Sequence, residues 1–280
     1  MGDRTAFATG LLELTRPGNA VAAGALTFIG AFVGGGLRAT SVALAVAATV
    51  FAVAAGNAAN DYFDRDIDRV NRPDRPIPSG RVSPRGAAVF SAVLFLGAVV
   101  AAVTLPVLAL GIAVVNLVAL VAYTELFKGL PGVGNAVVAY LTGSTFLFGA
   151  AAVESLGPDV WVLFGLAAVA TFARELVKDV EDVSGDREEG LRTLPIVAGE
   201  RATLTLAVVV MALGAGASVL PYARGTFGLA YLALVIPADG VMVGATALGF
   251  RDPGTAQRWL KRGTYLAAAA FVLGRIAVLG

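Results

Sequence analysis

Long apolar stretches, separated by short polar or glycine- and proline-containing breaks, run through the whole chain. A helix that spans a membrane needs about 20 mostly apolar residues. The pattern therefore predicts nine spanning helices, at residues 18–37, 40–60, 86–105, 107–127, 133–153, 159–178, 202–222, 227–249 and 258–279. The least marked break lies at Leu105 and Pro106, where one kinked helix would reduce the count to eight.

The composition supports an all-α polytopic membrane protein. Apolar residues make up 57% of the chain and charged residues 15%, whereas soluble domains carry about 25% charged residues. The chain contains no cysteine and no histidine, which excludes disulfides, thiolate nucleophiles and metal sites built on these residues. A net charge of +1 argues against a nucleic-acid-binding protein. No uninterrupted apolar stretch precedes the first span, so we expect no cleaved signal peptide.

Positive charge is distributed unevenly between the two sides that nine spans define. Only three of the 21 lysines and arginines, namely Arg38, Arg224 and Arg275, fall on the side opposite the N-terminus. Because basic residues accumulate on the cytoplasmic side, we expect the N-terminus and the loops on its side in the cytoplasm, with the protein in the cell membrane. Joining the third and fourth spans into one helix would remove this asymmetry, which favours nine spans.

Two acidic segments follow the second and the sixth predicted spans, on the same side of the membrane. Each contains three aspartates at positions i, i+3 and i+7, a spacing that places them on one face of a helix. Asn60 comes directly before the first triplet. The triplets are Asp61, Asp64 and Asp68 in the first segment and Asp179, Asp182 and Asp186 in the second.

The two segments resemble each other further along the chain. A Pro-Ile pair follows at 76–77 and again at 195–196, and a glycine with a nearby arginine comes next in both cases. The segments are four spans apart. We therefore expect two related four-helix halves plus one helix, within a single membrane-embedded domain over residues 1–280.

Three like charges on one helix face repel one another unless something compensates them. A solvated loop paired with its own arginines is one interpretation, but it does not account for the same spacing twice. The other interpretation is a pair of Mg²⁺ sites, because this ion prefers oxygen ligands and commonly bridges carboxylates to phosphate oxygens. Two acidic walls facing each other would then hold a diphosphate. Basic residues on the same side could neutralise the remaining charge: Arg72, Arg75, Arg81, Lys128, Arg174 and Lys178.

A diphosphate at the mouth of an apolar helix bundle indicates a polyprenyl diphosphate substrate, whose tail can lie between the helices. Metal ions and cations stabilise the charge that develops on the departing diphosphate. The remaining allylic carbocation needs no strong nucleophile, so this chemistry is compatible with a chain that lacks histidine and cysteine.

The two acidic segments resemble the signatures of the UbiA superfamily of intramembrane prenyltransferases. Asn60-Asp61-x-x-Asp64-x-x-x-Asp68 is similar to the first signature and Asp182-x-x-x-Asp186 to the second. The resemblance covers essentially the whole chain and implies a bundle of nine helices. It also implies two bound Mg²⁺ ions. The implied ligands are Asn60, Asp64 and Asp68 in one wall and Asp182 and Asp186 in the other, with Asp61 and Asp179 supporting or sharing these roles.

The family also carries a tyrosine and a lysine after its fourth helix, for which Tyr123 and Lys128 are the nearest match. We accordingly expect the residues that bind substrate to be Tyr123, Lys128, Arg16, Arg72, Arg174 and Lys178. The residues expected to act in catalysis are Asp64, Asp68, Asp182, Asp186 and Lys128.

Three segments, at 14–19, 60–80 and 174–182, resemble the branch of this family that acts in archaeal ether-lipid synthesis. That resemblance implies transfer of a geranylgeranyl group from geranylgeranyl diphosphate to the hydroxyl of geranylgeranylglyceryl phosphate, with Mg²⁺ as cofactor and membrane lipids as surroundings. One alternative is a family member that prenylates an aromatic quinone precursor. The other is a cation transporter, which is disfavoured because both acidic segments face the same side at the membrane edge.

Two polar residues lie inside or beside predicted spans. Asp239 is an acid within a span and hence a functional candidate. It could face the cavity or pair with a polar neighbour. Asn135 is expected to bond a neighbouring helix.

Overall fold

The computed structural model describes residues 2–36, 38–127 and 129–279, which form helices and no strand within these ranges. The elements before residue 153 are α1 (Gly2–Leu14), α2 (Pro17–Gly34), α3 (Ala39–Phe63), α4 (Arg65–Asn71), α5 (Pro84–Ala102), α6 (Val107–Ala122), the π-helical turn η1 (Tyr123–Phe127) and α7 (Val133–Ala152). The later elements are α8 (Pro158–Glu181), α9 (Val183–Glu188), α10 (Leu194–Ala198), α11 (Glu200–Ala217), α12 (Leu220–Ala223), α13 (Leu229–Leu248) and α14 (Pro253–Leu279).

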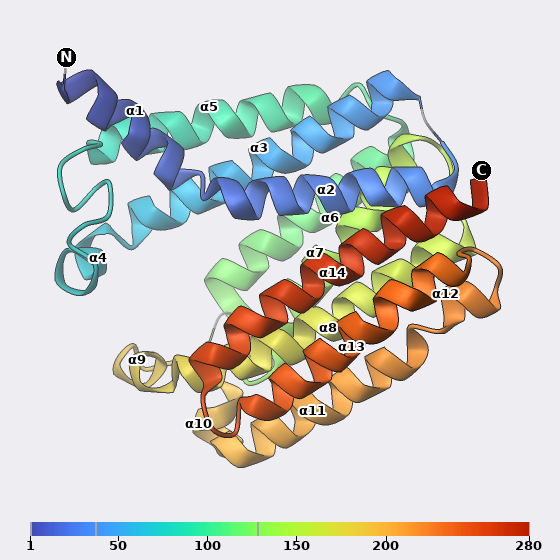
Figure 1. Ribbon diagram of the computed structural model, residues 1–280. Coiled ribbons are helices and arrows are strands. Elements are labelled where there is room, and N and C mark those ends of the chain that lie inside the picture. Colours follow the sequence, from blue (N-terminus) through green and yellow to red (C-terminus); the bar gives the residue numbers. More distant parts are fainter. Residues whose placement is uncertain (1, 37, 128, 280) are drawn as a thin grey trace.

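The long helices run along the bundle and place the two chain ends at opposite ends of it (Figure 1). The N-terminal helix α1 lies at the same end as the short helices α4, α9 and α10. The C-terminus lies at the other end, near the connection between α2 and α3. Both acidic segments are therefore at one end of the bundle, as the one-sided charge pattern predicts.

Among the described residues, eight helices are long and apolar enough to cross a membrane, so the chain is a multi-pass membrane protein. The expected break near Pro106 is present, because α5 ends at Ala102 and α6 begins at Val107. However, α6 has only 16 residues and continues into the five residues of η1. The fourth predicted span, at 107–127, is thus a short α-helix extended by a π-helical turn, and the count of nine is not confirmed.

Proline and local caps determine where the helices begin. α2, α5, α8 and α14 each start at a proline, whose fixed φ angle suits the first turn of a helix. α14 begins five residues before the predicted span at 258–279. Its first turn is capped by Asp252, whose Oδ1 accepts a hydrogen bond from the Thr255 amide at 2.8 Å. Residues 253–257 are Pro-Gly-Thr-Ala-Gln, which do not extend the apolar stretch, so the helix start was not predicted.

Small residues let α2 and α7 approach each other closely in the centre of the bundle. A Cβ atom added at Gly149 would lie 1.9 Å from the Thr27 carbonyl oxygen, and one at Gly30 would lie 2.2 Å from that of Phe146. Such contacts of backbone against backbone are typical of helices packed in membranes.

Large apolar side chains cover the outward faces of the peripheral helices. On α5 and α6, for example, Val93 is 61% exposed, Val107 85% and Val118 62%. A surface of this kind suits the hydrocarbon interior of a membrane, where exposure of apolar side chains carries no cost.

Asp239 pairs with a polar neighbour. The Ser218 hydroxyl donates a hydrogen bond to Asp239 Oδ2 at 2.6 Å, and the Tyr231 hydroxyl donates to the Ser218 carbonyl at 2.7 Å. Of the two interpretations of this acid, the structure therefore supports the structural one, in which Asp239 ties α13 to the end of α11.

The close packing of α2 on α7 yields a stability prediction. Gly149→Ala should destabilise the protein by about 1–3 kcal/mol, because the new methyl group cannot fit against the Thr27 backbone without displacing α2. The measurement is the melting temperature in detergent. Gly165→Ala in α8 is the control, since no atom lies within 4 Å of a Cβ there. Equal melting temperatures for the two variants would contradict this account of the contact.

Candidate active site at the ends of α3 and α8

Both acidic segments have the same local structure, a long helix that breaks at the middle aspartate of the triplet. α3 ends at Phe63, and Asp64 adopts φ −81° and ψ 1° before α4 begins. α8 ends at Glu181, and Asp182 adopts φ −92° and ψ 3° before α9 begins. The three aspartates of each segment therefore do not lie on one continuous helix, as the i, i+3, i+7 spacing suggested. The last aspartate of each triplet therefore belongs to the short helix after the break, α4 or α9.

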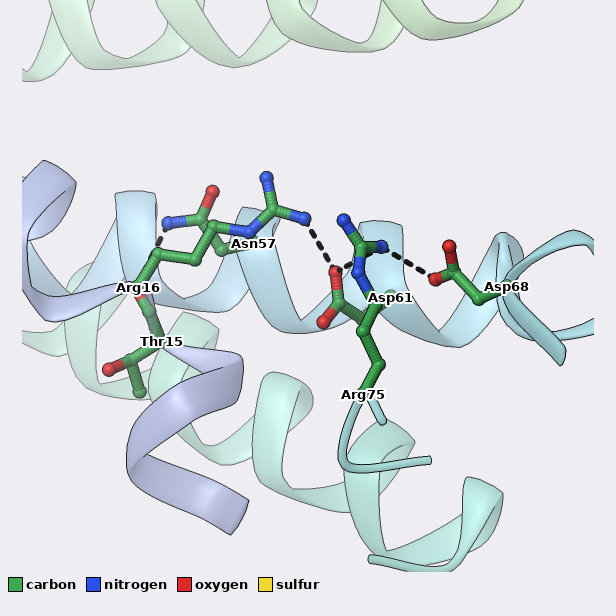
Figure 2. A network of polar contacts seen from close by, with 6 residues as sticks. All are labelled: Thr15, Arg16, Asn57, Asp61, Asp68 and Arg75. Carbon is green, nitrogen blue, oxygen red and sulfur yellow. Dashed lines mark hydrogen bonds and ion pairs between the residues drawn. The ribbon is translucent and has the colours of Figure 1, made fainter. Parts of the chain in front are cut away.

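The first segment carries a network of ion pairs around Asp61 (Figure 2). Asp61 is 5% exposed. Its Oδ1 atom lies 2.6 Å from Arg16 Nη2 and 3.4 Å from Arg75 Nη1. The same Arg75 nitrogen lies 2.6 Å from Asp68 Oδ2. Two guanidinium groups thus compensate two buried carboxylates, which a low-dielectric position requires.

Arg16 is held in an unusual backbone conformation. It precedes Pro17 at the start of α2 with φ 45° and ψ 66°, a left-handed conformation that favours glycine. The neighbouring Thr15 carbonyl accepts a hydrogen bond from Asn57 Nδ2 at 2.9 Å (Figure 2). The contacts of Asn57 and Asp61, both on α3, therefore fix the junction between α1 and α2.

Asn60 and Asp64, the first two predicted metal ligands of this segment, are placed differently from Asp61. Asn60 is exposed and Asp64 half-buried, and neither side chain makes a hydrogen bond or ion pair within the part of the chain that the structure describes. Arg72, also exposed, has no acidic partner there either. These oxygen and guanidinium groups are available to a ligand.

The second segment is built around Asp179 and Asp182. Asn135 in α7 donates its Nδ2 hydrogen to Asp179 Oδ2 at 2.8 Å, which confirms that Asn135 bonds a neighbouring helix. Lys178 Nζ lies 3.2 Å from Asp182 Oδ2. Arg174 lies 3.7 Å from Glu175. Glu175, Asp179 and Asp182 therefore each have a different polar or charged partner.

A small polar cavity of about 30 Å³ lies beside Asp179. Tyr123 and Lys178, both expected to bind substrate, line it, as does Asn135. Thr193 also lines it, and its buried hydroxyl has no hydrogen-bond partner. The structure thus places Tyr123 beside the second acidic segment. Lys128, the other residue of that pair, lies outside the described residues.

Across residues 2–36, 38–127 and 129–279, no three acidic side chains form a group able to hold a metal ion. The ion pairs explain this, because Arg75 separates Asp61 from Asp68 and Lys178 engages Asp182. Two facing acidic walls therefore stay a prediction. The positions of Asn57 and of Arg75 between two carboxylates carried no recognisable signal in the sequence, since each depends on contacts between distant segments.

Comparison with known proteins gives consistent matches over nearly the full chain. Residues 22–272 match the UbiA prenyltransferase family. The chain is 63% identical over 271 residues to a digeranylgeranylglyceryl phosphate synthase from Natronomonas pharaonis, covering 96% of this chain and 98% of that protein. A solved structure described for digeranylgeranylglyceryl phosphate synthase in membranes has a TM-score of 0.79 at 34% identity, covering 99% of this chain and 100% of the other. A UbiA homologue from Archaeoglobus fulgidus bound to GPP and Mg²⁺ has the same fold, with a TM-score of 0.72 at 18% identity and coverage of 96% and 99%.

The hydrogen bond between Asn135 and Asp179 yields a second stability prediction. Asn135→Leu should destabilise the protein by about 1–3 kcal/mol, because it leaves the Asp179 carboxylate without its donor. The melting temperature in detergent again measures the effect. Asn116→Leu in α6 is the matched control, since the buried Asn116 Oδ1 atom has no hydrogen-bond partner among the described residues. A loss of the same size in both variants would show that the bond to Asp179 is not the cause.

Proposed function

The chain belongs to the UbiA prenyltransferase family, and we propose that it transfers a geranylgeranyl group from geranylgeranyl diphosphate to the free hydroxyl of geranylgeranylglyceryl phosphate, in archaeal ether-lipid synthesis. The observation that carries this proposal is the near-full-length similarity to relatives named digeranylgeranylglyceryl phosphate synthase. The site agrees with it, because acidic and basic groups gather at one end of an apolar helix bundle.

The donor atoms at the end of α3 fit Mg²⁺. Asn60 and Asp64 offer amide and carboxylate oxygens that no described residue engages, and such oxygens are the ligands this ion prefers. Asn60 and Asp64 would help to hold the ion, whose positive charge would offset the charge on the departing diphosphate. The A. fulgidus homologue bound to GPP and Mg²⁺ supports this proposal.

In this proposal, the residues of each acidic segment have different roles. Asn60, Asp64 and Asp68 would hold one metal ion, and Asp182 and Asp186 the other. Asp61 and Asp179 would support these sites indirectly, since each side chain already bonds to a residue of another element. Arg75 and Lys178 reduce the repulsion between the carboxylates.

The remaining predicted residues would bind the diphosphate directly. Lys178 and Arg174 carry positive charge along α8, and Tyr123 can donate its phenolic hydrogen from the neighbouring turn. Lys128 completes this set in the proposal. Charge-assisted hydrogen bonds of this kind both bind the substrate and stabilise the leaving group.

The chain's topology suits two lipid substrates. The prenyl tail would lie between the helices, while the diphosphate stays at the polar end of the bundle. The positive-inside rule places this end, with the N-terminus, on the cytoplasmic face of the cell membrane.

A transfer assay on the detergent-solubilised protein tests the proposed function. We expect radiolabelled geranylgeranyl diphosphate and geranylgeranylglyceryl phosphate to yield a labelled diether phosphate. EDTA should stop the reaction and Mg²⁺ restore it. A parallel reaction with 4-hydroxybenzoate is the control for acceptor class. A prenylated aromatic product alone would overturn the choice of acceptor, and turnover unaffected by EDTA would overturn the use of a metal.

Removal of one carboxylate from either segment should abolish turnover. Asp64→Ala and Asp182→Ala should each lower kcat by at least about 100-fold, because each removes a charged ligand that acts on the transition state. The melting temperature should change little, since neither side chain packs in the core. Initial rates of diether formation measure the effect.

The control for these variants lies in the same segment. Asp66→Ala removes an exposed carboxylate that pairs only with Arg65 and Arg69, so this variant should keep normal turnover. Normal activity in Asp64→Ala or Asp182→Ala would refute a mechanism that needs both segments.

A further inference from the structure

A cavity of about 460 Å³ lies beside the first acidic segment, where the junction of α1 and α2 meets the loop after α4. Three arginines line it: Arg16, Arg72 and Arg75. The proposed metal ligands Asn60 and Asp64 do not line it. The cavity is thus lined by arginines and by Asp61, and it adjoins the proposed metal ligand Asp68 through Arg75.

The acids of this cavity are largely compensated by groups already described. Asp61 is shared by Arg16 and Arg75. Glu13 accepts a hydrogen bond from Arg81 Nη1 at 2.7 Å, and this bond lowers the pKa of the Glu13 carboxyl below its ordinary value. Asp74 is the remaining acid of the lining, and it is exposed to solvent.

The arginines, by contrast, keep unused donors. Arg16 engages Asp61 through Nη2 alone, which leaves Nε and Nη1 without a partner among the described residues; its side chain is 37% exposed. Arg72 makes no side-chain hydrogen bond or ion pair with those residues at all. Guanidinium groups with free N–H donors recognise phosphate oxygens directly and need no metal for it.

Contacts with residues of α3 hold Arg16 in its backbone conformation. Its left-handed backbone, with φ 45°, is held by the hydrogen bond from Asn57 to the preceding carbonyl and by the ion pair with Asp61 (Figure 2). Conformations of this kind in residues other than glycine persist only where surrounding contacts impose them, and they concentrate at functional sites. Asn57 and Asp61 therefore aim the Arg16 side chain at this cavity.

We infer that this cavity binds the phosphate group of the acceptor lipid, with Arg16 and Arg72 donating to the phosphate oxygens and Asn57 acting as a positioning residue for Arg16. The inference rests on the proposed function. In this inference, different kinds of protein group bind the two anionic groups of the reaction. The diphosphate of the donor uses carboxylates and metal, and the phosphate of the acceptor uses guanidinium groups.

The spacing suits the acceptor. Asp61 and Asp64 are three residues apart, and the helical rise between such positions is about 4.5 Å. In geranylgeranylglyceryl phosphate, only carbons of the glycerol separate the phosphate from the reacting hydroxyl. A phosphate held next to Asp61 therefore brings that hydroxyl close to the diphosphate held at Asp64.

The test compares two acceptors on wild-type protein and variants. The acceptors are geranylgeranylglyceryl phosphate and the same lipid without its phosphate. Wild-type protein should prefer the phosphate form in kcat/KM by at least about 10-fold, the effect of losing charge-assisted hydrogen bonds. Arg16→Gln should raise KM for the phosphate acceptor about 10-fold, change KM for geranylgeranyl diphosphate less than about twofold, and reduce the preference for the phosphate form.

Three further variants, one of them a control, keep the test valid if Arg16→Gln folds poorly. Arg72→Gln alters an exposed side chain without a partner, so it should fold normally and show the same KM pattern. Arg69→Gln, whose side chain is 61% exposed and pairs with Asp66 outside the cavity, should behave as wild type. Asn57→Ala should weaken acceptor binding in the same direction as Arg16→Gln.

The possible outcomes separate this inference from the proposed function. If wild-type protein converts neither acceptor, the proposed function fails and the inference fails with it. If wild-type protein is active but Arg16→Gln and Arg72→Gln raise only KM for geranylgeranyl diphosphate, the cavity serves the donor and the inference alone is overturned. An unchanged preference for the phosphate acceptor in both variants would overturn it equally.

Discussion

Asp61 accepts interactions from two arginines that come from opposite sides in sequence, Arg16 at 2.6 Å and Arg75 at 3.4 Å. A buried carboxylate without such partners would cost several kcal/mol. The pairing therefore joins the start of α2, the end of α3 and the loop after α4 into one unit. The backbone of Arg16, the register of that loop and the walls of the neighbouring cavity all depend on it.

The membrane determines where such a network can exist. Within the hydrocarbon region a backbone must satisfy its own hydrogen bonds, so α3 and α8 continue as regular helices. At the edge this demand ends. Asp64 and Asp182 each break a helix there, yet their amides still bond to the carbonyls of Asn60 at 2.8 Å and Lys178 at 2.9 Å. The amides of Asp68 and Asp186 likewise bond to the carbonyls of Asp64 at 2.8 Å and Asp182 at 2.9 Å, so backbone hydrogen bonds continue across each break.

Features that depend on local composition were predictable from the sequence, whereas features that depend on distant contacts were not. The helical class, the positions of most spans and the location of both acidic segments at one end follow from apolar length and charge. The short α6 was not predicted, because apolar residues continue through the π-helical turn that ends it. The helix breaks were missed because spacing alone cannot separate one helix from two. Likewise Asn57 to Thr15 spans 42 residues and Asn135 to Asp179 spans 44, so neither pairing has a local signature.

The proposed reaction between two anionic lipids poses an electrostatic problem, and the proposed arrangement at α3 would solve it. If both anions were bound through the same metal ions, their mutual repulsion would oppose the approach of the hydroxyl to the prenyl group. Guanidinium groups next to Asp61 would compensate the charge of one anion. About one helical turn away, carboxylate and amide oxygens that no described residue engages would hold the metal that compensates the other anion. Asp61 can serve as the boundary because its charge is already compensated by Arg16 and Arg75, so it neither attracts a metal ion into the arginine-lined cavity nor repels a phosphate from it. In this proposal, the fixed pairing of one buried aspartate would separate the binding site of the acceptor phosphate from that of the donor diphosphate.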